Sequence, residues 1–172
     1  MDLMDGVMNW IDNKKWSDKF LPEIKQICGL HLIGEPPIIE DMQHNTDLIV
    51  LNMMPKRVAC RIRRFSYYGK YHNDFTIRAK LPNGTETELT KIIKGFGDYI
   101  FYGFSDHQEN KLFAWKLADL SIFRLWFAKQ LATGNFKKFL HKNTDGSSQF
   151  YSFKWSDFPL NFIIDESKDS QQ

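Results

Sequence analysis

The chain has little cysteine, and its two cysteines, Cys28 and Cys60, are far apart in a sequence of 172 residues. They form neither a C-x-x-C pair nor the evenly numbered set that is typical of a disulfide framework. The ligand spacings of zinc sites are also missing. We therefore expect two reduced, packed thiols without a metal or redox role.

Long apolar runs are missing as well. No stretch approaches the roughly 18 apolar residues that a membrane-spanning helix needs, and the segment MDLMDGVMNW has acids where a signal peptide has basic residues. We expect a cytoplasmic protein with no membrane contact. With 42% hydrophobic and 15% aromatic residues, the chain suits one core, so we expect a single domain at 1–165 and a disordered tail at 166–172.

Signatures of small-molecule enzymes are absent from the sequence. The five histidines are scattered, without an H-E-x-x-H motif. Walker, dinucleotide-binding and G-x-S-x-G motifs are missing too, because the glycines of KGFGDY and FYGF precede strand-like residues. We expect no organic cofactor.

Basic residues, in contrast, are concentrated in the middle of the chain. Residues 54–80 contain eight lysines or arginines and one acid, Asp74, which gives this segment a net charge of +7. The remaining residues have 15 basic and 20 acidic side chains, a net charge of −5. Such segregation is typical of a surface that binds phosphates or an acidic protein.

The segment RVACRIRR at 57–64 has the alternation of a β-strand. Val58, Cys60 and Ile62 would lie on one face of a sheet, and the alternate positions, which include three arginines, on the other. Guanidinium groups can bind phosphates in bidentate fashion. The alternative is a solvated sheet face whose arginines pair with acids elsewhere in the chain.

Aromatic residues follow these arginines directly. Four of them between 65 and 71 are interleaved with Arg64 and Lys70 in a predicted loop. Aromatic rings beside cations offer stacking platforms for unpaired bases, although tyrosines are equally favoured at protein interfaces. The predicted nucleic-acid contacts are Arg57, Arg61, Arg63, Arg64, Arg78, Tyr67 and Tyr68.

The order of the predicted elements indicates an α/β (α+β) fold with a central mixed β-sheet flanked by helices. The periodicity predicts strands at 46–53, 57–64, 74–80, 98–104, 111–117 and 150–155. Caps and stop signals predict helices at 20–28, 85–95 and 119–134. We expect the first three strands to form an antiparallel meander.

Five phrases occur along residues 16 to about 126: FLPEIKQICG, EDMQHNTDLIVL, RVACRIRR, FTIRAKLPNGTETELTKIIKGFGDYIFYGF and WKLADLSIFR. In these phrases and their order the chain resembles a family of uncharacterised phage and prophage proteins. Its element order resembles the αβββαβ core of the PD-(D/E)XK nuclease-like superfamily. The resemblance implies a nuclease-like fold and a location in the cytoplasm of an infected or lysogenic bacterial host.

A nuclease of that superfamily holds Mg²⁺ or Mn²⁺ with an acid at the head of one strand and an acid-x-lysine pair on the next. Asp47 stands where the first acid belongs, whereas the next strand has Ala59, Cys60 and Arg61 in place of the pair. The motif is therefore degenerate. Arg61 stays protonated, so it can bind a phosphate but cannot transfer a proton.

Acids from neighbouring elements can replace the missing pair. Glu88 with Lys91 one turn later, or Glu40 and Asp41 before the first strand, can supply them. The predicted catalytic residues are then Asp47, Glu88 and Lys91, and the predicted metal ligands are Asp41, Asp47 and Glu88. Alternatively, Asp47 accepts local backbone hydrogen bonds and Glu88 is the capping-box partner of Thr85.

Two hypotheses of function remain. The first is a nuclease-fold phage or mobile-element protein that binds DNA or RNA through its basic sheet face and cleaves phosphodiesters with a metal. The second is a non-enzymatic interaction protein that inhibits a host defence nuclease, as anti-CRISPR proteins do. In the second, the acidic segments 40–47 and 105–110 would contact a basic partner, and free DNA would bind weakly.

Overall fold

The structure is a computed structural model that describes residues 3–29, 33–34, 49–50, 56–81, 84, 86–143, 146 and 148–167. Its contacts divide the chain into two compact units, residues 1–55 with 110–112 and residues 56–109 with 113–172. All of the predicted nucleic-acid contacts belong to the second unit.

The first unit begins with two consecutive helices. The first helix, α1 (Leu3–Asp18), ends with an ion pair between Lys14 and Asp18 at 2.7 Å. The second, α2 (Leu21–Gly29), matches the predicted helix at 20–28 and buries Ile24. Helix α1 was missed in the sequence, although Leu3, Val7 and Ile11 recur there every four residues.

Two short strands of the first unit, β1 (Ile33–Gly34) and β2 (Ile49–Val50), pair antiparallel. Strand β2 coincides with two residues of the strand predicted at 46–53. The other residues of that predicted strand, Asp47 among them, lie outside the described residues.

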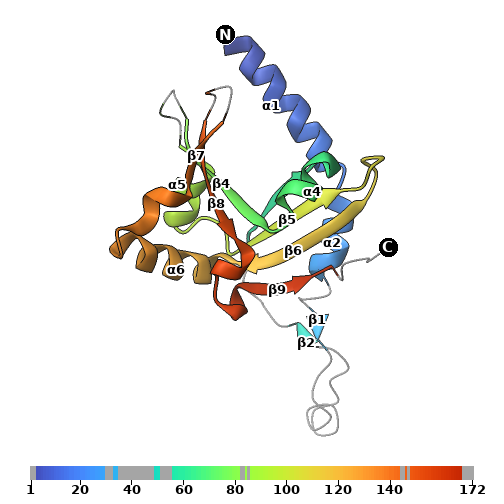
Figure 1. Ribbon diagram of the computed structural model, residues 1–172. Helices are drawn as coiled ribbons and strands as arrows, with labels where there is room; N and C mark the ends of the chain where they lie inside the picture. Colours follow the sequence, from blue (N-terminus) through green and yellow to red (C-terminus); the bar gives the residue numbers. More distant parts are fainter. Residues whose placement is uncertain are drawn as a thin grey trace, which may run out of the picture. The chain divides into compact units, whose positions relative to one another are not determined.

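The second unit contains the predicted mixed sheet. Its strands are β3 (Val58–Arg63), β5 (Tyr99–Ser105), β6 (Leu112–Asp119) and β9 (Ile163–Glu166), in the order β3-β5-β6-β9 (Figure 1). Strands β3 and β5 pair in parallel, whereas β6 and β9 pair antiparallel. After β9 the chain continues in register, because Ser167 N donates to Trp115 O at 2.9 Å.

A second sheet of the same unit corrects the predicted meander. Strand β4 (Asp74–Lys80) pairs antiparallel with β8 (Gln149–Lys154), and β8 pairs with β7 (Leu140–Lys142). Strands β3 and β4 therefore belong to different sheets, although they are close in sequence. The segment between them turns the chain away from β3 through η1 (Phe65–Tyr67) and α4 (Tyr68–Tyr71).

Two helices of this unit were predicted from their caps. Helix α5 (Glu88–Ile93) starts after the N-cap Thr87. In α6 (Leu120–Ala132) the N-cap Asp119 accepts a hydrogen bond from Ser121 N at 2.7 Å. After the C-cap Thr133 of helix α6 comes Gly134, whose φ of 72° is the left-handed conformation that favours glycine. None of the helices in the described part of the chain is long and apolar enough to cross a membrane.

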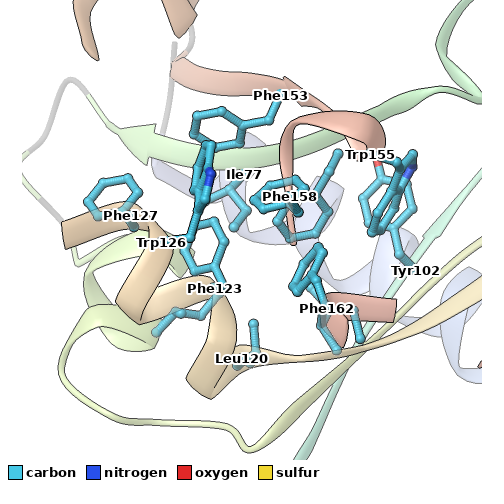
Figure 2. Close-up of a cluster of buried hydrophobic side chains, with 14 of the residues drawn as sticks. Ile77, Tyr102, Leu120, Phe123, Trp126, Phe127, Phe153, Trp155, Phe158 and Phe162 are labelled. Carbon is cyan, nitrogen blue, oxygen red and sulfur yellow. The ribbon is translucent and has the colours of Figure 1, made fainter. Parts of the chain in front are cut away.

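The core of the second unit is built mainly from aromatic rings, as Figure 2 shows. Phe123 of α6 is 0% exposed and lies 5.7 Å from Phe75 of β4 and 6.2 Å from Phe153 of β8, measured between ring centroids. Phe158 and Phe162, from the turns before β9, also contact Phe123. Helix α6 is thus held against the β4-β8-β7 sheet by these rings, each of which buries a large area.

We predict that Phe123→Ala lowers the free energy of unfolding by about 3–5 kcal/mol, because it removes a fully buried ring and leaves a cavity. Chemical denaturation measures the loss. Leu125→Ala is the matched control, since Leu125 lies on the same helix but is 68% exposed, and its effect should stay within about 0.5 kcal/mol. Equal losses in the two variants would contradict this description of the core.

Candidate nucleic-acid interface

The basic face of β3 is turned toward the other elements of the second unit. Ala59 packs against the core, and Arg61 and Arg63 are half-buried. On the opposite face Val58 is 36% exposed and Cys60 is exposed. The predicted alternation is confirmed, but a fully solvated arginine face is not found, because the half-buried Glu88 and the buried Tyr102 supply acceptors for the guanidinium groups.

Arg61 forms an ion pair with Glu88 of α5, with 2.5 Å between Nη1 and Oε2. The same carboxylate oxygen accepts a hydrogen bond from Arg78 N at 3.4 Å, so it links β3, β4 and α5. Burial lowers the pKa of Arg61, but Glu88 and the Tyr102 hydroxyl raise it by more, and the net pKa is above its usual value. Arg61 therefore stays charged, and its charge is largely balanced by Glu88.

Tyr102 of β5 connects the two sheets through its hydroxyl group. The side chain is 1% exposed. Arg63 Nη1 lies 3.3 Å from Tyr102 Oη, and Thr76 Oγ1 of β4 lies 3.0 Å from it. Because a guanidinium only donates hydrogen bonds, Oη accepts from Arg63 and can give its own proton to Thr76.

Arg63 also contacts the faces of two tyrosines. Its Cζ lies 4.8 Å from the ring centroid of Tyr67 and 5.0 Å from that of Tyr71. These tyrosines are four positions apart across η1 and α4, a spacing that places two side chains on one helical face. Among the described residues, this guanidinium donates one hydrogen bond, to Tyr102, although the group has five N–H donors.

We name Arg63, Tyr67, Tyr71 and Tyr102 the arginine–tyrosine cluster. Tyr67 is 46% exposed, and Lys70 Nζ lies 5.2 Å from the ring of Tyr71. The cluster thus combines a cation held in place by three aromatic side chains with an accessible aromatic ring. Such a combination suits an anion with two acceptor oxygens, such as a phosphate or a carboxylate, beside a flat apolar group.

The other predicted contacts differ in how accessible their charges are. Arg64 forms an ion pair with Glu109. Arg57 is exposed just before β3, where its backbone N donates to Asp98 Oδ2 at 2.7 Å. Arg78 is exposed on β4, close to the Arg61–Glu88 pair through its backbone. The structure therefore places Arg61 and Arg63 on one face of β3 and links the backbone of Arg78 to the Arg61–Glu88 pair, whereas Arg57 precedes the strand and Arg64 is engaged with Glu109.

Tyr68, another predicted nucleic-acid contact, is half-buried and packs against other aromatic rings. Its ring lies 4.9 Å from that of Phe113 and 5.3 Å from that of Phe104. It also lines a cavity of about 60 Å³ next to Tyr102 and Trp155. This cavity has room for a few water molecules and is far smaller than the roughly 300–1,000 Å³ of typical ligand pockets.

The described part of the predicted metal site does not suit a cation. Glu88 is paired with Arg61, whose positive charge opposes a metal at the same carboxylate. Lys91 is exposed one turn later, and Asp41 and Asp47 lie outside the described residues. Among the residues that the structure describes, no group of three His, Cys, Asp or Glu side chains could hold a metal ion.

The alternative role of Glu88 as a capping-box partner of Thr85 is also corrected. The N-cap of α5 is Thr87, whose Oγ1 accepts from Thr90 N at 3.4 Å. Glu88 is therefore the first residue of the helix, where a carboxylate is favoured by the helix dipole but cannot complete a capping box. Its side chain is free to turn toward Arg61.

Two members of the site were missed in the sequence. Tyr71 was recognised as an aromatic neighbour of the basic segment but not as a contact of Arg63. Tyr102 was not singled out, because in the strand DYIFYGF it alternates with Phe101 and Gly103 as any core residue would. Tyr102 becomes a candidate only once the parallel pairing of β3 with β5 is known, because that register places Arg61 opposite Tyr102.

No protein-family model, curated protein or solved structure matches this chain. A function is therefore inferred from the chemistry of the cluster and its surroundings. The resemblance to phage nuclease-like proteins stays a prediction.

We predict that the Arg61–Glu88 pair is coupled by about 1–2 kcal/mol, because both side chains are less than one-third exposed, and exposed pairs contribute only 0.2–1 kcal/mol. A double-mutant cycle of Arg61→Met and Glu88→Gln, followed by chemical denaturation, measures this coupling. Additive single losses would show that the pair does not hold α5 to β3.

Proposed function

We propose that the protein binds nucleic acid and that the arginine–tyrosine cluster is the centre of the binding surface. The observation that carries the proposal is the placement of Arg63, which is fixed by Tyr67, Tyr71 and Tyr102 and retains unused donors among the described residues. A phosphate oxygen pair is a good partner for such a planar group.

The exposed ring of Tyr67 supplies the second part of the proposal. A nucleotide presents a flat base next to its charged phosphate, so a ring beside a guanidinium can contact both. Lys70 and Arg78 add positive charge near the cluster, and both are exposed. These features support a contact with unpaired nucleotides or with a backbone, whereas Arg61 contributes mainly by holding Glu88.

The phage origin and the nuclease-like ancestry belong to the same proposal. They are supported by the order of the sequence phrases and by a mixed sheet with flanking helices. Metal-dependent cleavage with Mg²⁺ or Mn²⁺ has weaker support, because Glu88 is engaged with Arg61. In this proposal binding does not depend on cleavage.

A second candidate is the interaction protein that inhibits a host defence nuclease. The pairing of Arg61 with Glu88 and of Arg64 with Glu109 favours it, since both pairs reduce the charge that a phosphate backbone would encounter. Exposed Tyr67 would then contact a protein, because tyrosines contribute large contact areas at low entropic cost. Weak binding of free nucleic acid by the wild type would support this candidate.

We predict that Arg63→Ala weakens nucleic-acid binding about five-fold or more at low salt, because it removes a phosphate contact and the cation beside two tyrosines. Fluorescence anisotropy with labelled oligonucleotides gives the affinity, and a salt series should show a slope reduced by about 0.7–0.9. Circular dichroism establishes that the variant is folded.

Lys129→Ala is the matched control for this substitution. It removes one exposed positive charge from α6, away from the cluster, so affinity should change less than two-fold. Equal effects of Arg63→Ala and Lys129→Ala would show that only the net charge matters and would contradict a specific site at Arg63.

A further inference from the structure

The outer face of the β4-β8-β7 sheet has a row of one cation and two aromatic rings. The register pairs Arg78 of β4 with Phe150 of β8, and Phe150 with His141 of β7. Residues that are directly opposite on neighbouring strands share a face, with Cβ atoms about 5 Å apart. We name Arg78, Phe150 and His141 the outer row.

The outer row is not part of the core. The adjacent positions Ile77 and Tyr151 point to the opposite face, where Ile77 is 0% exposed and Tyr151 packs against the buried cluster. In the outer row Arg78 and His141 are exposed and Phe150 is half-buried. The rings of His141 and Phe150 are stacked, with 5.5 Å between centroids and 26° between planes.

The three strands are strongly basic. They contain four lysines or arginines and a single acid, and that acid, Asp74, is paired with Lys154 at the end of β4 that is distant from Arg78. Lys80 and Lys142 lie at the same end of the sheet as the outer row, both exposed and both opposite Gln149 in the register, and Lys142 is on the face away from His141. This end of the sheet therefore has a positive charge that complements phosphates.

The outer row continues from the arginine–tyrosine cluster. Thr76, which is bonded to Tyr102 Oη, is two residues before Arg78 on β4. Residues two apart in a strand share a face and are about 7 Å apart. Tyr102 and Thr76 are buried, at 1% and 4% exposed, so the accessible residues on the two sides of this contact are Tyr67 with Arg63 and Arg78 with the stacked Phe150 and His141. We name these five residues the binding path. Strands β4, β8 and β7, which carry the far end of this path, lie side by side in Figure 1.

We propose that this path binds single-stranded nucleic acid, with a base stacked on the His141–Phe150 pair and the neighbouring phosphates on Arg78 and Lys80. The proposal rests on the proposed nucleic-acid binding and adds the strandedness of the ligand and a second stacking position. In a duplex the bases are already paired and stacked, so side chains that offer ring faces favour an unpaired strand.

The test compares single strands with a duplex. Fluorescence anisotropy would be measured with labelled oligo(dT) and oligo(U) of about 20 nucleotides, longer than the roughly 4–16 nucleotides that one small stacking domain covers, and with a DNA duplex of the same length. The variants are His141→Ala and Phe150→Leu. Phe96→Leu is the matched control, since Phe96 is 54% exposed and lies in the turn between α5 and β5.

The wild type should bind at least one of the single strands more tightly than the duplex. His141→Ala and Phe150→Leu should each weaken that binding about three- to five-fold or more and change duplex binding less than two-fold, because a lost stack affects only unpaired bases. Phe96→Leu should bind as the wild type does. Phe150 is half-buried, and its substitution can unfold the protein. If Phe150→Leu unfolds, His141→Ala still tests the proposal, because His141 is exposed.

Two negative results are distinguishable. If the wild type binds neither single strands nor duplex, the proposed function itself fails, and this inference fails with it. If Arg63→Ala weakens binding but the two outer-row variants bind single strands as the wild type does, only this inference is overturned. Tighter binding of the duplex would overturn it as well.

Discussion

The buried hydroxyl group of Tyr102 is the interaction on which the second unit and its candidate site both depend. The ring belongs to the aromatic core, 5.6 Å from Phe75 and 5.6 Å from Trp155. The hydroxyl joins Arg63 of one sheet to Thr76 of the other. A polar group that is 1% exposed must keep its hydrogen bonds, because an unsatisfied one costs about 1–3 kcal/mol. The two hydrogen bonds of Tyr102 Oη therefore hold β3 and β4 in a fixed relative position.

The need to satisfy buried polar groups also explains how arginines can occur on the face of β3 that packs inside the unit. Arg61 is neutralised by Glu88, and Arg63 is held by Tyr102 and by the faces of two further tyrosines. The first pairing is structural, since it attaches α5 to β3. The second leaves donors at the edge of the packed region, where an external anion can reach them. One basic strand therefore serves both stability and the proposed binding.

The sequence predicted the local elements well and their partners poorly. The alternation in RVACRIRR, the capped helix at α6 and the strand β4 followed from periodicity and cap residues, which are local signals. That β3 pairs in parallel with β5, and β4 with β8, depends on contacts between residues that are distant in sequence, such as Phe75 and Phe153. For the same reason Arg61, Arg63 and Arg78 were recognised as candidates, but Tyr102, which accepts a hydrogen bond from Arg63, was not.

The most direct measurement of the central claim is the affinity of Tyr102→Phe for a single-stranded oligonucleotide. This substitution keeps the ring in the core and removes only the hydroxyl that positions Arg63, so circular dichroism should show a folded protein. We expect binding to fall about three-fold or more, since an intramolecular hydrogen bond contributes a net of roughly 1 kcal/mol. A folded Tyr102→Phe protein that binds as tightly as the wild type would contradict it.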